Sequence, residues 1–231
     1  MAALIRVDDV GRADSRTDAL LTALCTAGVK LTCAVVPDWL TPATRDRLMC
    51  LWHKHPGRIE IHQHGFRHTN HGTNEDKFEF GPARTPAEQD SDVRVGRAIL
   101  ERAFGPAFFP AFTPPYGACD RTTDHVLRAA GFLVKSTFTT NHQTGSLPDF
   151  APALDCFEWN PARALSWAEV VQRWAAAEDA PIAGLILHPR LMSWPTVQSY
   201  ATGIPRLVEK LGTAIFADLV DAAALAPVRF I

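Results

Sequence analysis

The stretch Leu4-Ile5-Arg6-Val7-Asp8-Asp9 decides the fold that we expect for this chain. It is a short apolar run that ends in two adjacent carboxylates, which is typical of a buried strand that reaches the edge of a sheet. Side chains at the carboxyl ends of parallel strands point into the cleft where α/β proteins bind ligands. Taken alone, Asp8-Asp9 also fits a strand-end turn. Adjacent acids repel each other, however, and a metal ion bound by one of them would remove that cost.

Histidines cluster further along the chain, where four of the nine lie within ten positions. Residues four apart meet on one face of a helical turn, so His64 and His68 can grip one divalent ion. His62 and His64 would share one face of a strand, and that pairing stays open as an alternative. A solvated histidine-rich loop is the remaining alternative. Two imidazoles and one carboxylate would leave positions for water and substrate, and the second carboxylate could take a proton from that water.

The composition describes an ordinary globular protein. The chain has 231 residues, of which 47% are apolar and 21% charged, and we expect one domain over residues 1–231. A net charge of −2 gives no reason to expect nucleic acid or an anionic membrane as partner. No apolar run approaches the roughly 20 residues of a transmembrane helix. The segment Met1-Ala2-Ala3-Leu4-Ile5-Arg6 lacks a signal-peptide pattern, so we expect a cytoplasmic protein.

Cysteine spacing argues against a disulfide framework or a zinc knuckle. The number of cysteines is odd, and none forms a Cys-x-x-Cys pair. We expect reduced, mostly buried thiols, with Cys119 the one to watch because it follows a loop motif described below. The cysteines are Cys25, Cys33, Cys50, Cys119 and Cys156.

Short apolar runs alternate with helical patterns along the whole chain, which predicts βαβ units and a parallel sheet. Seven or eight such units favour an α/β fold, a distorted (β/α) barrel with about seven parallel strands. The expected strands are 4–8, 30–36, 58–64, 108–113, 132–137, 153–157, 184–188 and 214–216. The expected helices are 17–27, 41–53, 85–104, 122–130, 166–177 and 196–211, the last interrupted at Gly203 and Pro205.

Two further segments carry polar groups at strand ends. Phe112-Thr113-Pro114-Pro115-Tyr116-Gly117 predicts a stiff loop, which could simply join a strand to a helix or could present Tyr116 and backbone groups to a ligand. Leu185-Ile186-Leu187-His188-Pro189 ends a buried strand with an imidazole, so His188 is a candidate general acid. The longest irregular stretch, Thr69 to Arg84, follows the histidines, and loops of that length are usually functional or disordered. Its Phe78 and Phe80 favour an ordered wall or lid.

In this order the segments resemble the motifs of the polysaccharide deacetylase family, the NodB-homology carbohydrate esterases. Arg6 to Gly11 stands in the place of Thr-Phe-Asp-Asp-Gly, and His64-Gly65-Phe66-Arg67-His68 in that of His-(Ser/Thr)-x-x-His. Thr113-Pro114-Pro115-Tyr116-Gly117 is similar to Arg-Pro-Pro-Tyr/Phe-Gly. Asp155 to Trp159 loosely echoes Asp-x-x-Asp-Trp, and Leu187-His188 matches the Leu-His of the fifth motif. The resemblance implies the NodB-homology barrel.

The resemblance also implies roles for individual residues. Asp9, His64 and His68 would bind one divalent metal ion, zinc first, with cobalt, nickel or manganese as alternatives. Asp8 would be the general base and His188 the general acid, and a backbone N–H around Tyr116 could hold the oxyanion. The residues expected to contact substrate are Pro114, Pro115, Tyr116 and Trp159.

Several positions depart from the family motifs. The third motif has Thr113 where the family has an arginine that orients the base, and Arg6, Arg163 and Arg190 are candidates to replace it. The first motif is Val-Asp-Asp-Val, Glu158 stands where an aspartate is usual, and Pro189 follows the fifth-motif histidine. These departures indicate a divergent branch of the family.

The expected activity is removal of an N-acetyl group from an amino sugar or a saccharide precursor. One alternative is a related amidohydrolase that acts on a ureide or a cyclic imide with the same metal and proton-transfer groups. Another is a catalytically degenerate saccharide-binding protein, which the Thr113 departure favours and the intact Asp8 and His188 oppose. Aromatic faces suited to sugar rings, such as Trp39 and Trp194, are equally consistent with packing.

Overall fold

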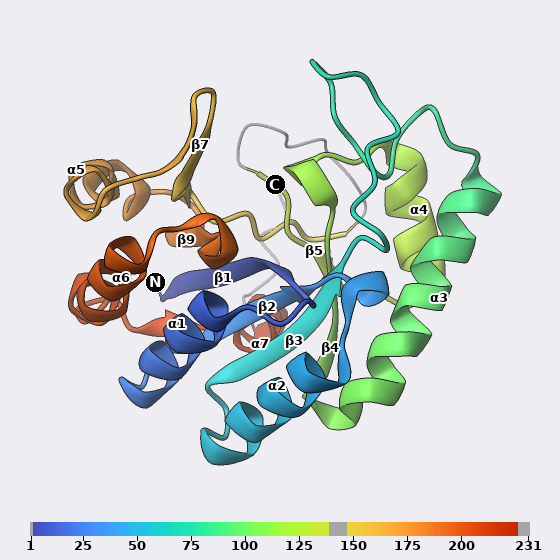
Figure 1. The fold of residues 1–231 in the computed structure, drawn as a ribbon. Coiled ribbons are helices and arrows are strands. Elements are labelled where there is room, and N and C mark those ends of the chain that lie inside the picture. Colours follow the sequence, from blue (N-terminus) through green and yellow to red (C-terminus); the bar gives the residue numbers. More distant parts are fainter. Residues whose placement is uncertain (1, 139–146, 226–231) are drawn as a thin grey trace.

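A parallel sheet curls around the centre of the molecule. The computed structural model describes residues 2–138 and 147–225. In this part of the chain the sheet order is β5-β4-β3-β2-β1-β9-β6, with β10 beside β1 (Figure 1). No ladder joins β5 to β6 in the described residues, so the barrel is open there, as expected for a distorted (β/α) barrel. The strands are β1 (Ala3–Val10), β2 (Leu31–Val35), β3 (Ile59–His64), β4 (Phe108–Thr113), β5 (Val134–Lys135), β6 (Leu154–Asp155), β9 (Gly184–Leu187) and β10 (Thr213–Ala214).

Helices cover the outer face of the sheet, and side-chain caps begin most of them. Thr85 and Ser166 each form a capping box with a glutamate three residues on, at the predicted starts of these two helices. Thr41, at the predicted start of another helix, caps it, and its first residue is Pro42. The helices are α1 (Ser15–Thr26), α2 (Pro42–Lys54), α3 (Pro86–Phe104), α4 (Arg121–Ala129), α5 (Trp167–Ala177), α6 (Trp194–Leu207) and α7 (Phe216–Leu225).

Alternation along the strands separates two layers of side chains. On β3, Ile59 and Ile61 join the large apolar cluster under the helices. Glu60, His62 and His64 occupy the alternate positions and point into the barrel, where all three are buried even though they are polar. The barrel interior therefore contains a column of polar groups as well as a small apolar cluster of Leu4, Ala111, Val134 and Phe216.

Helix α7 closes the bottom of this column. Phe216 is fully buried, and its ring centroid lies 4.9 Å from that of His62. The carboxyl group of Glu60 accepts hydrogen bonds of 3.0 Å from the backbone N–H groups of Phe216 and Ala217 and so caps the start of the helix. The prediction of a strand over 214–216 is therefore wrong at its end, because Glu60 is a long-range partner that a local pattern does not reveal.

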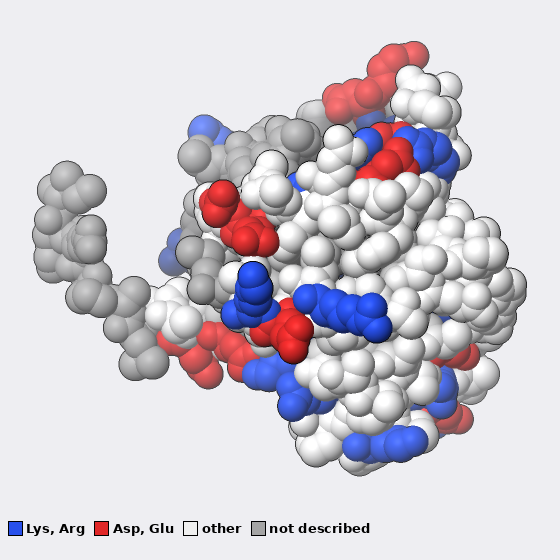
Figure 2. Space-filling model, turned by 90° about the vertical axis from the view of Figure 1, so that its left-hand side faces the viewer, with Lys and Arg blue, Asp and Glu red and all other residues white. Residues whose placement is uncertain are grey.

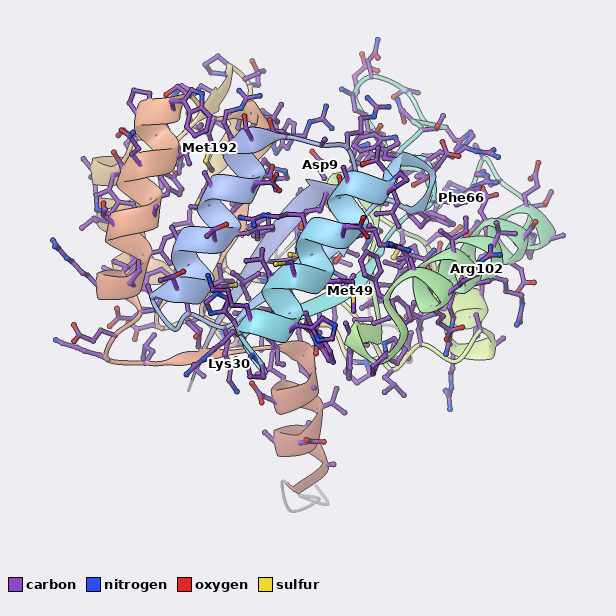
Figure 3. The ribbon with its side chains drawn as sticks, turned by 60° about the horizontal axis from the view of Figure 1, so that its bottom comes forward. Asp9, Lys30, Met49, Phe66, Arg102 and Met192 are labelled. Carbon is purple, nitrogen blue, oxygen red and sulfur yellow. The ribbon has the colours of Figure 1, made fainter. Side chains whose placement is uncertain are left out.

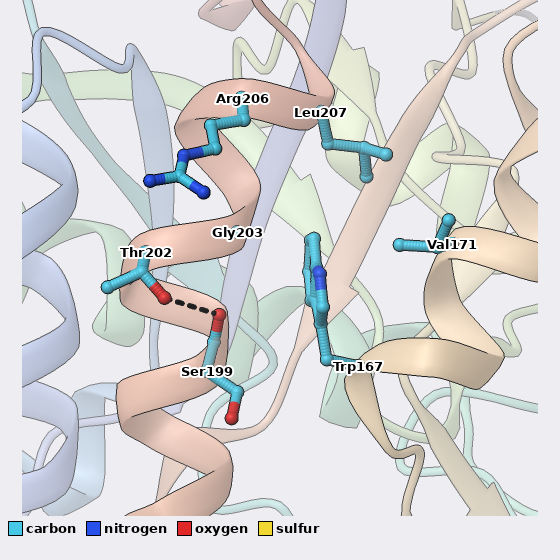
Figure 4. A pocket seen from close by; sticks show the side chains of 7 residues that line it. All are labelled: Trp167, Val171, Ser199, Thr202, Gly203, Arg206 and Leu207. Atoms are coloured by element: carbon cyan, nitrogen blue, oxygen red, sulfur yellow. Dashed lines mark hydrogen bonds between the residues drawn. The ribbon is translucent and has the colours of Figure 1, made fainter.

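Two other elements differ from those predicted from the sequence. The predicted strand 153–157 is two short strands, β6 and β7 (Phe157–Trp159), and β7 pairs antiparallel with β8 (Ala162–Ala164) in a separate hairpin. Helix α6 continues through Gly203 and Pro205, because Val197, Tyr200 and Ile204 anchor one face of it in the core. Figure 4 shows why glycine fits there: a Cβ on Gly203 would lie 2.2 Å from Cε2 of Trp167 on α5.

The surface over α5 and the hairpin carries both signs of charge. Figure 2 shows blue and red side chains interspersed on this face, where Arg163 pairs with Glu158 and Glu169, and Arg173 pairs with Glu158. None of the helices in the described residues has the length and apolar character needed to cross a membrane.

Candidate metal and hydrolytic site

The site lies at the carboxyl end of the parallel strands. Figure 3 shows Asp9, at the end of β1, and Phe66, just after β3, at the same end of the sheet. Lys30, which precedes β2, lies at the opposite end. Figure 1 shows the β7 hairpin and the segment between β3 and α3 rising beyond the sheet at the site end.

A local irregularity turns both acids of the first motif into the barrel. Alternation along a regular strand would send the side chains of Asp8 and Asp9 to opposite faces. Here Asp9 has a left-handed backbone with φ of 62°, and the pairing of β1 with β2 shifts register between Val7 and Val10. Such a bulge re-aims one side chain. As a result the two carboxyl groups serve the same site.

Asp9, His64 and His68 converge as a metal-binding triad would. Asp9 Oδ1 lies 3.5 Å from His64 Nε2 and 3.2 Å from His68 Nε2, and the three candidate ligand atoms lie within 4.8 Å of one another. Ligand atoms about 2.1 Å from a tetrahedral zinc ion would be roughly 3.4 Å apart. Asp9 Oδ1 is buried and makes no hydrogen bond to the described atoms, so a cation would satisfy it. These three residues therefore fit a divalent metal ion.

Thr113 fixes which nitrogen of each inner histidine is free. His64 Nδ1 donates to the backbone carbonyl of Thr113 at 3.0 Å, which leaves Nε2 facing Asp9. His62 lies deeper in the barrel, where its Nε2 pairs with the Thr113 hydroxyl at 2.8 Å. The alternative pairing of His62 with His64 as ligands is therefore wrong, because the strand face that they share runs down into the barrel.

His68 reaches the site through a loop and not through a helical turn. Gly65 and His68 have φ of 55° and 59°, so left-handed residues lie at both ends of the segment between the two histidines. The sequence prediction of a helical turn is wrong in this respect, although the two imidazoles do come together, with ring centroids 5.1 Å apart. Tyr116 donates its hydroxyl to the carbonyl of His68 at 3.1 Å and so helps to fix the loop.

Backbone strain is concentrated at this site. Asp9, His68 and Tyr116 are the three non-glycine residues of the described chain with positive φ, at 62°, 59° and 61°. Each such residue costs about 1–3 kcal/mol, and such residues cluster at functional sites where surrounding contacts enforce them. Asp9 and His68 are two of the three candidate ligands, and the ring of Tyr116 lies 4.8 Å from that of His68.

Arg6 holds Asp8 through two hydrogen bonds. Its Nε and Nη2 donate to the two carboxyl oxygens of Asp8 at 2.8 and 2.9 Å, and both side chains are buried. Arg6 Nη1 also donates to the backbone carbonyl of Ser136 at 2.9 Å and to its hydroxyl at 2.6 Å. Of the three arginines expected to replace the missing third-motif arginine, Arg6 contacts Asp8, the candidate base. Arg163 instead pairs with glutamates on the hairpin side, and Arg190 lies over Trp39.

The charges around the two acids favour their ionised forms. Burial alone would raise the pKa of Asp8, but the positive charge of Arg6 and the neighbouring histidines outweigh it and lower that pKa. Burial likewise opposes ionisation of Asp9, and contacts with His188, His64 and His68 reverse it, so its pKa is also lowered. Asp8 is therefore a carboxylate that can accept a proton.

Asp155 lies beside His188 at the end of β6. His188 Nε2 is 3.4 Å from Asp155 Oδ1, and His188 Nδ1 is 3.6 Å from Asp9 Oδ2. Burial opposes the charged form of His188, but Asp155 and Asp9 dominate and raise its pKa to about 10. An imidazolium with carboxylates on both sides suits a proton donor.

Residues of the loosely matched fourth motif face two different sets of partners. Trp159 is 54% exposed, donates Nε1–H to Asp155 Oδ2 at 3.0 Å, and has its ring 5.2 Å from that of His188. It is the most accessible of the residues expected to contact substrate, whereas Pro114 and Pro115 are buried and shape the loop backbone. Glu158 faces away from the site, toward Arg163 and Arg173.

Cys119 has no sign of a reactive thiol. All five cysteines are free, as predicted. Burial raises the pKa of the Cys119 thiol to about 12, so it stays protonated at neutral pH.

Two contributors to the site lay outside the sequence-based residue set. Asp155 opens the segment that loosely echoes the fourth motif, and that weak match was the only signal for its contact with His188. Glu79 accepts backbone hydrogen bonds from the turn after His64, and the apolar flanks Phe78 and Phe80 were the only clue that this part of the long segment is buried.

Comparison with known proteins assigns the family. A profile of the polysaccharide deacetylase family matches residues 2–134, which is more than half of the chain. The chain belongs to the polysaccharide deacetylase family. A comparison with curated protein sequences gives no match.

Solved structures with this fold include enzymes and a pseudoenzyme. A family 4 carbohydrate esterase from Streptomyces lividans, solved with acetate, is 18% identical, with a TM-score of 0.58 over 93% of this chain and 91% of the esterase. A family 4 acetyl xylan esterase from Clostridium thermocellum, solved with a cobalt ion, is 16% identical, with a TM-score of 0.64 over 97% and 93%. A family 4 pseudoenzyme from Bacillus anthracis is 16% identical, with a TM-score of 0.65 over 96% and 65%. At these identities the likeness shows the fold alone.

Proposed function

We propose that this protein is a metal-dependent hydrolase that removes an N-acetyl group from an amino sugar or a saccharide precursor. One observation carries the proposal: the Asp9, His64 and His68 triad lies between a carboxylate held by Arg6 and an imidazole held by Asp155. Such a cluster would combine a metal site, a proton acceptor and a proton donor, which together support hydrolysis of an amide.

Each residue of the cluster has a distinct task. Asp9, His64 and His68 would hold a divalent ion, zinc first, which supplies Lewis-acid polarisation of the acyl carbonyl and activation of water when bound. Asp8, kept ionised by Arg6, takes the proton of the attacking water. His188, kept protonated by Asp155, gives a proton to the departing amine, which is otherwise a very poor leaving group.

Neighbouring groups would bind and orient the substrate. A backbone N–H around Tyr116 would stabilise the developing oxyanion. The exposed face of Trp159 beside His188 suits the apolar face of a sugar ring. The intact proton-transfer groups favour catalysis over a purely binding role, even though one protein of this fold is a pseudoenzyme.

The test is acetate release from a panel of N-acetylated sugars, sugar nucleotides and oligosaccharides. The assay would be run with a chelator and with zinc, cobalt, nickel or manganese added back, and Asp8→Asn would be the blank. Metal-dependent release that disappears in the blank supports the proposal. Turnover of ureides or cyclic imides without acetate release would move the activity to a non-sugar amide. No turnover of any substrate by metal-loaded protein would leave a binding role.

A further inference from the structure

Glu79 is a buried carboxyl group that contacts the turn between the two metal-binding histidines. It is 1% exposed, although it lies in the irregular segment between β3 and α3. Its Oε2 accepts from the backbone N–H of Phe66 at 3.1 Å, and its Oε1 accepts from that of Arg67 at 2.7 Å. No lysine, arginine or histidine of the described chain pairs with it. Burying a carboxyl group without a cation is costly unless its oxygens are hydrogen-bonded, so these two contacts explain its place.

Gly65 and Glu79 fit each other. A Cβ on Gly65 would lie 2.0 Å from Glu79 Oε2 and 2.4 Å from Pro115 Cγ, so a side chain there would require both neighbours to shift. The family motif that this segment resembles has serine or threonine at that position. In this chain the space of that side chain is filled by the carboxyl group of Glu79, which comes from a later segment.

The segment that carries Glu79 is anchored on both sides of it. Phe78 is buried, and its carbonyl accepts from the N–H of His71 at 2.8 Å. Phe80 is fully buried, with its ring 5.3 Å from that of Phe112 on β4. The carboxyl group is therefore held in place independently of the turn that it contacts.

We propose that Glu79 is a positioning residue for the metal-ligand turn. Its two hydrogen bonds fix the amides of Phe66 and Arg67, and this fixes the left-handed backbone that aims the imidazole of His68 at Asp9. Without these bonds the strained turn relaxes, and His68 no longer lies where His64 and Asp9 require it. The inference rests on the proposed function only in taking Asp9, His64 and His68 as metal ligands.

The experiment compares Glu79→Gln and Glu79→Ala with Glu75→Gln, a matched change at an exposed glutamate of the same segment. Glutamine keeps the volume of Glu79 but offers one acceptor oxygen, so it leaves one of the two amides unpaired. Zinc affinity would be measured by competition with a chromophoric chelator. Amide hydrogen exchange would be measured on the metal-free proteins, with the β2 amides as an internal reference.

Residues that orient metal ligands change metal affinity by about 10- to 100-fold when they are replaced. We expect zinc affinity to fall by about that factor in both Glu79 variants, and the amides of Phe66 and Arg67 to exchange faster than in the parent. The amides of β2 and the Glu75→Gln protein should be unchanged. Faster exchange confined to the turn supports Glu79 as its anchor even if acetate release fails for every substrate. Parent-like zinc affinity, parent-like exchange at Phe66 and Arg67, or uniformly faster exchange over the whole protein would each overturn the proposal.

Discussion

Replacing Arg6 by methionine should destabilise the protein strongly at neutral pH and less in acid. Methionine keeps much of the volume but removes both hydrogen bonds to Asp8. Removing one partner of a buried ion pair costs about 3–5 kcal/mol, because the other charge is left uncompensated. Asp8 is 2% exposed, so water cannot replace the lost donors.

The pH dependence identifies the cause of that loss. In the parent the pKa of Asp8 is lowered, so its stabilising effect is present above the ordinary aspartate pKa and is lost as the pH falls through the folded-state pKa. Without Arg6, burial dominates and the carboxyl group takes up a proton more readily. The difference in free energy of unfolding between parent and Arg6→Met should therefore shrink from pH 7 toward pH 4.

Urea unfolding of the metal-free proteins at several pH values would measure this difference. Arg163→Met, which removes an exposed arginine paired with partly exposed glutamates, is the control and should cost little at any pH. The double variant Arg6→Thr/Thr113→Arg places the arginine where the family motif has it. It should recover part of the stability and activity that are lost when Arg6 alone is replaced. An equal loss of unfolding free energy at pH 4 and pH 7 would show that lost packing, and not the uncompensated charge of Asp8, destabilises Arg6→Met.

Three further changes have defined outcomes. Glu60→Gln should remove a pH dependence: burial raises the pKa of Glu60 from 4.5 to about 7, so the folded state holds the proton and stability falls as pH rises between these values. That contribution is about 3 kcal/mol, and equal pH slopes for parent and variant in urea unfolding would contradict it. Asp155→Asn should lower the pKa of His188 and so move the alkaline limb of the pH profile of kcat to lower pH. An alkaline limb at the same pH would show that Asp155 does not keep His188 protonated. Gly203→Ala should lower the melting temperature because the new Cβ would lie 2.2 Å from Trp167. This clash should outweigh the roughly 1 kcal/mol by which alanine favours helices over glycine. An unchanged or higher melting temperature would show that Trp167 and α5 can shift to make room.

The sequence predicted the alternation of strands and helices because each element carries its own periodicity and caps. Thr85 and Ser166 begin helices by contacts only three residues long, and such local signals survive without tertiary information. The prediction failed at residue 216 because the cap of α7 is Glu60, which is far away in the sequence.

At the site, too, local sequence signals were predictive and long-range contacts were not. The grouping of Asp9, His64 and His68 followed from motif order, since parallel strands bring their carboxyl ends together. The bulge at Asp9, which brings it in beside Asp8, did not follow, because it depends on pairing between β1 and β2. The choice among three candidate arginines also needed the fold, because Arg6 reaches Asp8 along one strand face while its other nitrogen binds Ser136 from β5's end.

Hydrolysis of an N-acetyl group by this protein should require one divalent ion at Asp9, His64 and His68. The most direct measurement is a titration of metal-free protein with zinc, following bound metal and the rate of acetate release together. Bound metal and the rate of acetate release should rise in parallel and level off at one equivalent of zinc, and Asp9→Asn should abolish both. Acetate release that is independent of zinc, or that persists in Asp9→Asn, would contradict this requirement.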